Sequence, residues 1–144
     1  MATERTAQVT WNGSLMEGDG TITSTTSGAI GEQAVSWASR ADDANGKTSP
    51  EDLIAAAHAS CFAMALSHAL AQGGNTAEEL RTSATVTFQP GEGITKIALT
   101  VDGRVPGLDE AAFRQAAEGA KDGCPVSKAL AGVPEITLDA KLES

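Results

Sequence analysis

The chain has 144 residues, which suits one domain with a buried core and falls short of two, so we expect a single domain over residues 1–144. Nineteen acidic and ten scattered basic residues give a formal net charge of −9. Because this charge repels nucleic-acid phosphates and anionic lipid, we expect no nucleic acid and no membrane as partners.

The N-terminal third is predicted to be a meander of strands. Residues 5–11 alternate between polar and apolar side chains and lead into Asn12-Gly13, a pair typical of hairpins, and residues 20–28 follow as a second strand. A third strand is predicted over Gln33–Ser39, with Arg40 at its end. The first residues contain no apolar signal core, which predicts a cytoplasmic protein.

A long helix is predicted to start at Ser49, a good N-cap, and to run to about Gln72 before two glycines. Its length would be roughly 35 Å at about 1.5 Å per residue. From Leu53 to Ala71 it is apolar or small nearly all round, which predicts burial on every side. Histidine and serine interrupt this run, so a core helix is favoured over a membrane span.

The remainder alternates strands and helices. Strands are predicted over residues 82–88 and 94–103, a helix over Asp109–Lys121, a short helix opened by Pro125, and a last strand over residues 135–142. This order predicts an α+β fold. The chain has only three phenylalanines and two tryptophans, which is too little aromatic side-chain volume to cover so apolar a helix on every side. We therefore expect a second copy of the chain to cover the rest of the helix. The predicted assembly is a homodimer with antiparallel sheets wrapped around long buried central helices.

Two cysteines are the candidate reactive groups. Cys61, in the long helix, is equally typical of a small buried hydrophobe. Cys124 precedes Pro125, so its sulfur should point toward free backbone N–H groups, which stabilise a thiolate. His58 and Cys61 are three residues apart, but no paired metal-binding motif accompanies them, and we expect no metal. These residues alone leave the role of the thiols open.

Two segments, SPEDLIAAAHASCFAMALS at residues 49–67 and GCPVSKAL at residues 123–130, closely resemble the OsmC/Ohr family of thiol peroxidases. The resemblance covers nearly the whole chain, including Trp11-Asn12-Gly13, residues 94–99 and Val105-Pro106-Gly107. The Cys-Pro-Val-Ser form and the position of Arg40 are similar to the OsmC branch.

The resemblance implies an intertwined homodimer that reduces organic hydroperoxides, and hydrogen peroxide less readily, without a bound cofactor. Cys61 would be the peroxidatic thiolate, and Cys124 would close an intramolecular disulfide with it. Arg40 would supply the cation that a buried thiolate needs, and Glu51 would hold that arginine. The implied reductant is a lipoyl dithiol or another small dithiol.

Two alternatives remain open from the sequence. One is a stress protein that carries an acyl or aromatic ligand in an apolar cleft, and the other is a dithiol oxidoreductase that acts on protein disulfides. Helix geometry adds a further expectation for the peroxidase. Glu51 and Cys61 are ten residues apart, about 15 Å along a straight helix, so one arginine could bridge them by direct hydrogen bonds only if the helix bent sharply near Ser60. No proline interrupts the helix between them, which favours a straight helix. We therefore expect an active site built from two chains.

Overall fold

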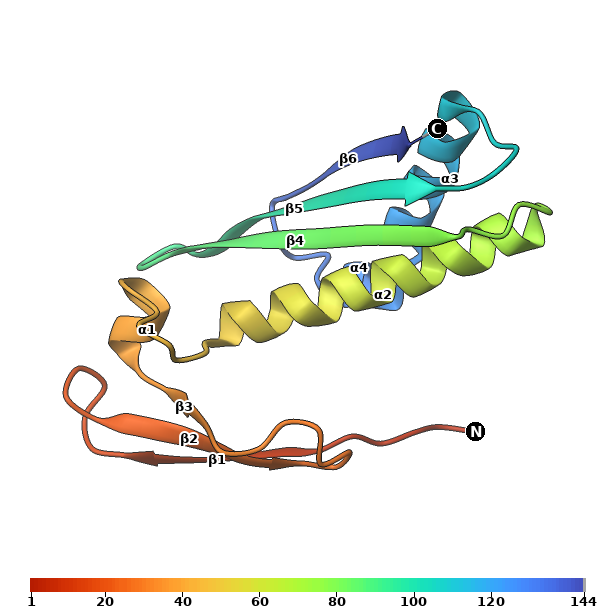
Figure 1. Cartoon of the computed structure of the whole chain (residues 1–144). Coiled ribbons are helices and arrows are strands. Elements are labelled where there is room, and N and C mark those ends of the chain that lie inside the picture. The colour runs from red at the N-terminus through yellow and green to blue at the C-terminus, as the bar shows by residue number, and fades with distance from the viewer. Residues whose placement is uncertain (144) are drawn as a thin grey trace. The chain divides into compact units, whose positions relative to one another are not determined.

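The computed structural model describes residues 1–143 and separates into two compact units, Met1–Leu53 and the chain from Ile54 onward. We treat each unit by itself, and the single domain stays a prediction. The elements, labelled in Figure 1, are β1 (Ala7–Asn12), β2 (Asp19–Thr25), β3 (Gln33–Val35), α1 (Trp37–Ala41), α2 (Pro50–Gln72), β4 (Glu79–Gln89), β5 (Gly93–Arg104), α3 (Glu110–Gly123), α4 (Pro125–Ala129) and β6 (Glu135–Glu143).

The first unit is built on an antiparallel meander of β1, β2 and β3, as the sequence predicts. Trp11 on β1 lies opposite Gly20 on β2. A Cβ atom at Gly20 would lie 2.6 Å from the Trp11 ring, so only glycine lets the indole lie flat across this pair of strands.

The third strand is shorter than predicted, because residues 37–41 form the helix α1. Ser36 caps this helix: the Ser39 N–H donates to the Ser36 hydroxyl at 3.1 Å, and the Ser36 N–H donates to the Ser39 hydroxyl at 3.0 Å. This reciprocal capping box satisfies backbone donors that a strand would leave at the sheet edge. The prediction of a strand through Ser39 is therefore wrong after Val35.

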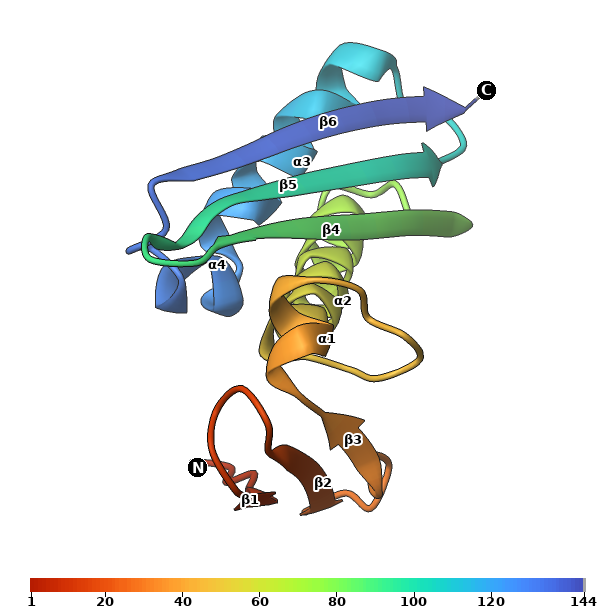
Figure 2. The same ribbon diagram turned by 90° about the vertical axis from the view of Figure 1, so that its left-hand side faces the viewer.

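The second unit contains a sheet in the order β4, β5, β6 (Figure 2). β4 and β5 are antiparallel along their whole length, whereas β6 runs parallel to β5, with Ile97 opposite Ile136. The expectation of purely antiparallel sheets is wrong for β6. The reason is the connection: α3 and α4 carry the chain back along the sheet, so the next strand starts at the same end as β5.

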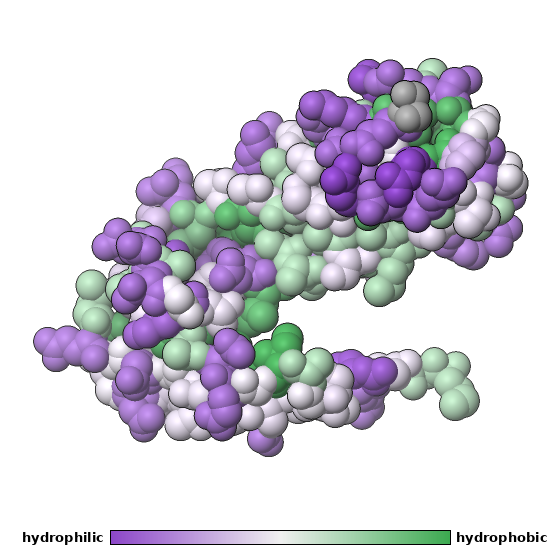
Figure 3. All heavy atoms as spheres, in the orientation of Figure 1, coloured by the Kyte–Doolittle hydropathy of each residue, from purple (hydrophilic) through white to green (hydrophobic). Residues whose placement is uncertain are grey.

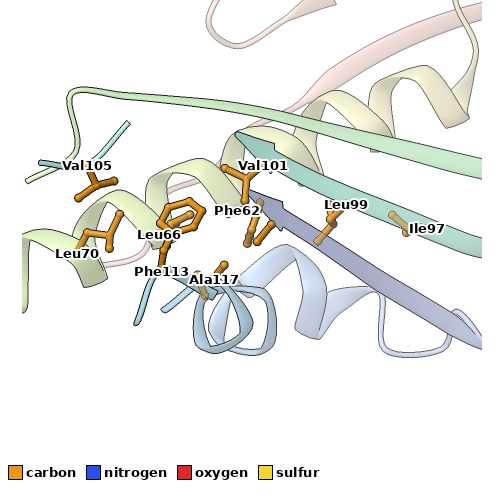
Figure 4. Close-up of a cluster of buried hydrophobic side chains, with 11 residues drawn as sticks. Phe62, Leu66, Leu70, Ile97, Leu99, Val101, Val105, Phe113 and Ala117 are labelled. Atoms are coloured by element: carbon orange, nitrogen blue, oxygen red, sulfur yellow. The ribbon is translucent and has the colours of Figure 1, made fainter. Parts of the chain in front are cut away.

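One face of this sheet carries the hydrophobic core, shown in Figure 4. Phe62, Leu66 and Leu70 recur every four residues along α2 and are at most 3% exposed. They pack in one cluster with alternate residues of β5 and with the buried side of α3, which are Ile97, Leu99, Val101, Phe113 and Ala117. α2 and α3 therefore cover the same face of the sheet.

The opposite side of α2 is exposed in the single chain. Met64 is 70% exposed, and Ser67 and His68 are exposed on the same side. Figure 3 shows weakly hydrophilic and apolar residues along this part of the surface. By length and composition, α2 is the helix of residues 1–143 that could cross a membrane. The predicted burial on every side thus depends on the expected second copy, and the homodimer stays a prediction.

Candidate active site

Cys124 lies at the junction of two helices. Its backbone N–H donates to the Ala120 carbonyl at 2.9 Å and closes α3, while the residue itself is the N-cap of α4, with Pro125 at the first helical position. Its side chain is fully buried. The sequence Gly123-Cys124-Pro125 produces this placement because proline starts a new helix where α3 has to end.

Cys61, in the middle of α2, meets Cys124 from the other side. The two sulfur atoms are 2.7 Å apart and share a thiol–thiol hydrogen bond, and both cysteines are free thiols. They come from positions 63 residues apart in sequence. The structure therefore brings together the two cysteines that the sequence singles out, and leaves Cys61 the more accessible.

The surroundings of the two thiols favour ionisation at Cys124. Burial alone would raise the pKa of Cys124, but its hydrogen bonding with the Cys61 sulfur, with the side chain and backbone of Ser127 and with the Val126 backbone N–H lowers that pKa overall. Burial raises the pKa of Cys61, and the neighbouring Cys124 raises it further. A hydrogen bond from the Val126 backbone opposes this rise in the pKa of Cys61 only in part.

A buried histidine lies one helical turn from Cys61. His58, one turn before Cys61 on α2, is 0% exposed, and its Nε2 is 2.7 Å from the Ser127 hydroxyl oxygen. Burial lowers the pKa of His58, which keeps the imidazole neutral. From the sequence, His58 is considered only as a possible metal ligand beside Cys61, and Ser127 is assigned no role. The available signal was their presence in the two segments that hold the cysteines.

Arg40 and Glu51 form a second pair in the first unit. The Arg40 Nε donates to Glu51 Oε1 at 3.0 Å, and its Nη2 donates to Oε2 at 3.0 Å. Glu51 is 8% exposed in the first turn of α2, where the Ser49 hydroxyl caps the helix by accepting from the Asp52 N–H at 3.1 Å. The capping fixes the carboxylate, and the two parallel bonds fix the guanidinium plane.

An apolar pocket of about 300 Å³ opens beside Arg40 in the same unit. Apart from Arg40 it is lined almost wholly by aromatic and aliphatic side chains: Val9, Trp11, Leu15, Ile22, Val35, Ser36, Trp37, Pro50 and Leu53. A pocket of this composition suits an apolar molecule with one polar end directed at the guanidinium.

The four predicted site residues thus form two pairs, Arg40 with Glu51 and Cys61 with Cys124, one pair in each unit. Within residues 1–143, no group of three or more histidine, cysteine, aspartate or glutamate side chains has the arrangement of a metal site. The chemistry available to these residues is that of thiols, a fixed cation and a neutral imidazole.

Comparison with known proteins identifies the family of the chain. The family model described as OsmC-like protein matches residues 42–139. Peroxiredoxin OsmC of Escherichia coli (strain K12) is 42% identical over 147 residues, covering 100% of both chains. Organic hydroperoxide resistance protein OhrB of Bacillus subtilis (strain 168) is 32% identical over 95 residues, which is 65% of this chain and 70% of OhrB.

Solved structures support the fold. An OsmC-like protein from Mycoplasma pneumoniae superposes with a TM-score of 0.73 at 16% identity, covering 100% of both chains. The structure of OhrB from Bacillus subtilis superposes with a TM-score of 0.59 at 24% identity, covering 96% of this chain and 98% of OhrB. On the full-length match to Peroxiredoxin OsmC and the family model over residues 42–139, the chain belongs to the OsmC family.

Proposed function

We propose that this protein is a cysteine-based peroxidase that reduces organic hydroperoxides, and less readily hydrogen peroxide, to protect the cell against oxidative or osmotic stress. The observation that carries the proposal is the contact of 2.7 Å between the Cys61 and Cys124 sulfurs, in a chain that is 42% identical to a peroxiredoxin. Two free thiols in contact are the arrangement that a reversible dithiol–disulfide cycle requires.

The reaction has two chemical steps. The Cys61 thiolate attacks the terminal oxygen of the hydroperoxide, the O–O bond breaks, and the alkoxide takes up a proton to leave as the alcohol, with Cys61 as a sulfenic acid. Cys124 then attacks the Cys61 sulfur, the S–O bond breaks, and hydroxide leaves and becomes water as the disulfide forms. A lipoyl dithiol or another small dithiol then reduces the disulfide and returns both cysteines to thiols.

Arg40 is proposed to make the first step possible. Burial and the neighbouring thiol both raise the pKa of Cys61, so its thiolate needs a permanent cation. Arg40 is such a cation, and Glu51 holds it in one orientation. Residues 51 and 61 both belong to α2, so about 15 Å of helix axis separates them. We therefore propose that Arg40 and Glu51 serve the Cys61 of a partner subunit in a homodimer.

The pocket beside Arg40 supports an organic substrate. Its lining is aromatic and aliphatic, so an alkyl or aryl group of the substrate would be buried there, away from water. The peroxide end of the substrate would face the guanidinium. Hydrogen peroxide has no such group to bury, and this is the physical reason to expect it to be the poorer substrate.

The experiment is a peroxidase assay with cumene hydroperoxide and a dithiol, comparing the wild-type protein with Cys61→Ser and Ser60→Ala. Ser60 is exposed beside Cys61, and its hydroxyl donates to the Ala56 carbonyl at 2.6 Å within the same helix, which makes it a matched control. Peroxide loss that stops in Cys61→Ser and persists in Ser60→Ala supports the proposal. Full activity in Cys61→Ser would refute it.

The same protein samples test the two alternatives. A carrier of apolar ligands would bind a fluorescent fatty acid equally well with or without Cys61 and would consume no peroxide. A dithiol oxidoreductase would reduce a protein disulfide such as that of insulin and leave peroxide alone.

A further inference from the structure

Four side chains form a continuous row in the second unit. Cys61 contacts Cys124, Ser127 acts on Cys124 from the first turn of α4, and Ser127 in turn contacts His58. His58 and Cys124 are 0% exposed, and Ser127 is 8% exposed. The peroxidase steps proposed above use the two cysteines and leave His58 and Ser127 without a role.

The protonation of His58 follows from its surroundings. Its Nδ1 is buried and has no hydrogen-bond partner among residues 1–143, and burial keeps the ring neutral with a single N–H. If Nδ1 carried that hydrogen, a buried N–H donor would be unpaired, which is rarer in proteins than an unpaired acceptor. The hydrogen therefore lies on Nε2, which donates to the Ser127 oxygen at 2.7 Å.

This tautomer determines what Ser127 can do. A hydroxyl has one hydrogen, and the Ser127 oxygen already accepts from His58, so the hydrogen is available to a second acceptor. Ser127 is the third residue of α4 and Cys124 is its N-cap, so the two residues share one helical turn, and the Cys124 backbone N–H is already donated to the Ala120 carbonyl. A hydrogen bond from the Ser127 side chain is one of the causes that lower the pKa of the Cys124 thiol.

We propose that His58 is a positioning residue that fixes the Ser127 hydroxyl as a donor to the Cys124 sulfur and so holds Cys124 as the thiolate that resolves the oxidised Cys61. The resolving role of Cys124 rests on the proposed function, whereas the hydrogen-bonded row does not. The step balances: the Cys124 thiolate forms the S–S bond, the S–O bond of Cys61 breaks, and the departing hydroxide joins the proton that Cys124 released, giving water. A neutral sulfenic acid on Cys61 no longer opposes the charge on Cys124.

Three other ionisable groups lie near this row: Asp122 and Lys128 are exposed, and Lys121 is partly buried. Lys121 and Asp122 of α3 and Lys128 of α4 line a pocket of about 360 Å³ that also borders Ser127, and β6 contributes the uncharged Ile136 to it. Lys121 already pairs with Glu118 at 3.3 Å. Salt screens charges at the surface but does not screen the buried hydrogen bonds of the row. Varying the ionic strength therefore separates the effect of the surface charges on Cys124 from the effect of His58 and Ser127.

The first experiment titrates Cys124 directly. In a Cys61→Ser background Cys124 is the only cysteine, and its ionisation is followed by the ultraviolet absorbance of the thiolate, which needs no access to the buried sulfur. His58→Leu and Ser127→Ala should each move the midpoint up by about one pH unit, the effect of losing one hydrogen bond to a charged group. The double variant should move it no further, because both changes remove the same bond.

Conservative variants distinguish positioning from simple packing. His58→Gln places an amide N–H where Nε2 lies, and Ser127→Thr keeps the hydroxyl, so both should return the midpoint close to the parent value. Lys128→Gln is the surface control and should leave the midpoint in place at high salt. A midpoint that is unchanged in folded His58→Leu, or that moves equally in Lys128→Gln, would overturn the proposal. If His58→Leu does not fold, Ser127→Ala and His58→Gln decide the question alone.

The second experiment tests the kinetic consequence with both cysteines present. After one equivalent of cumene hydroperoxide, Ser127→Ala should form the Cys61 sulfenic acid at the parent rate. It should close the disulfide about tenfold more slowly at a pH below the midpoint. Equal closure rates would refute the resolving role. Absence of any peroxide reaction in the parent protein would instead refute the proposed function and leave the titration result standing.

Discussion

Arg40 binds Glu51 edge-on, with Nε 3.0 Å from one carboxylate oxygen and Nη2 3.0 Å from the other. Lysine cannot reproduce two parallel bonds from one planar group, although it keeps the charge. Arg40→Lys should therefore lower kcat/KM for cumene hydroperoxide by about 10- to 100-fold, the range expected for loss of one hydrogen bond between charged groups. Steady-state kinetics with a dithiol in excess measures this, and unaltered kinetics would show that orientation is unimportant.

Cys124→Ser should uncouple the two steps. Cys61 can still attack the peroxide, but no second thiol is present to displace the hydroxide. The protein should therefore complete one rapid turnover and then stop as the Cys61 sulfenic acid. A dimedone-type probe should label Cys61 in this variant and leave the wild-type protein almost unlabelled. Non-reducing mass spectrometry of the oxidised wild-type protein should show a chain lighter by two hydrogens, whereas covalent dimers would contradict an intramolecular bridge.

A composite active site can be tested by mixing two inactive proteins. Cys61→Ser lacks the nucleophile and Glu51→Ala lacks the anchor of Arg40. Unfolded and refolded together, they should form heterodimers in which one site has an intact cysteine from one chain and an intact Arg40–Glu51 pair from the other. Part of the activity should then return. Confirmed heterodimers without activity would place Glu51 and Cys61 of the same chain in one site.

His58 should make stability depend on pH. Burial lowers its pKa in the folded protein, whereas in the unfolded chain it titrates near 6.5, so below that pH the unfolded state binds the additional proton. The contribution of His58 to the free energy of unfolding should be at its maximum above about pH 6.5. It should fall as the pH decreases toward the folded-state pKa, by at most about 1.4 kcal/mol per pH unit. Denaturant titrations of wild type and His58→Gln should differ in this slope, and parallel slopes would contradict it.

Gly103 should not tolerate a side chain. A Cβ atom there would overlap the Phe113 ring, which is 0% exposed in the core between β5 and α3. Gly103→Ala should destabilise the protein by about 1–3 kcal/mol, the cost typical of overpacking. Gly119→Ala on α3 is the control, because a Cβ at Gly119 meets no atom within 4 Å. Equal midpoints of urea unfolding for the two variants would contradict this account.

The sequence predicts most of the elements because their signals are local. Ser49 at the start of α2 and the glycines after Gln72 bound the long helix correctly, and Pro125 marks the break between α3 and α4. The direction of β6 could not be predicted, since alternation in residues 135–142 is identical for parallel and antiparallel strands. The pattern in residues 33–39 looked like a strand because the capping box of Ser36 and Ser39 uses serine at both positions.

The family resemblance points to both cysteines, Arg40 and Glu51 as site residues, and their roles stay predictions. The structure shows which of these residues are in contact, Arg40 with Glu51 and Cys61 with Cys124. The contact between His58 and Ser127 joins residues 69 positions apart, so no local pattern in the sequence could reveal it.

Cys61 lies within α2, while Cys124 is the joint between α3 and α4. A covalent bond between them would tie three helices together and close a loop of 63 residues, which by chain-entropy arguments raises the free energy of unfolding by about 4 kcal/mol. Peroxide would then act on this protein as a stabiliser and the dithiol as a destabiliser. The melting temperature would be higher for the disulfide form than for the dithiol form, so a thermal-shift dye would report the redox state of the two cysteines without any chromogenic substrate.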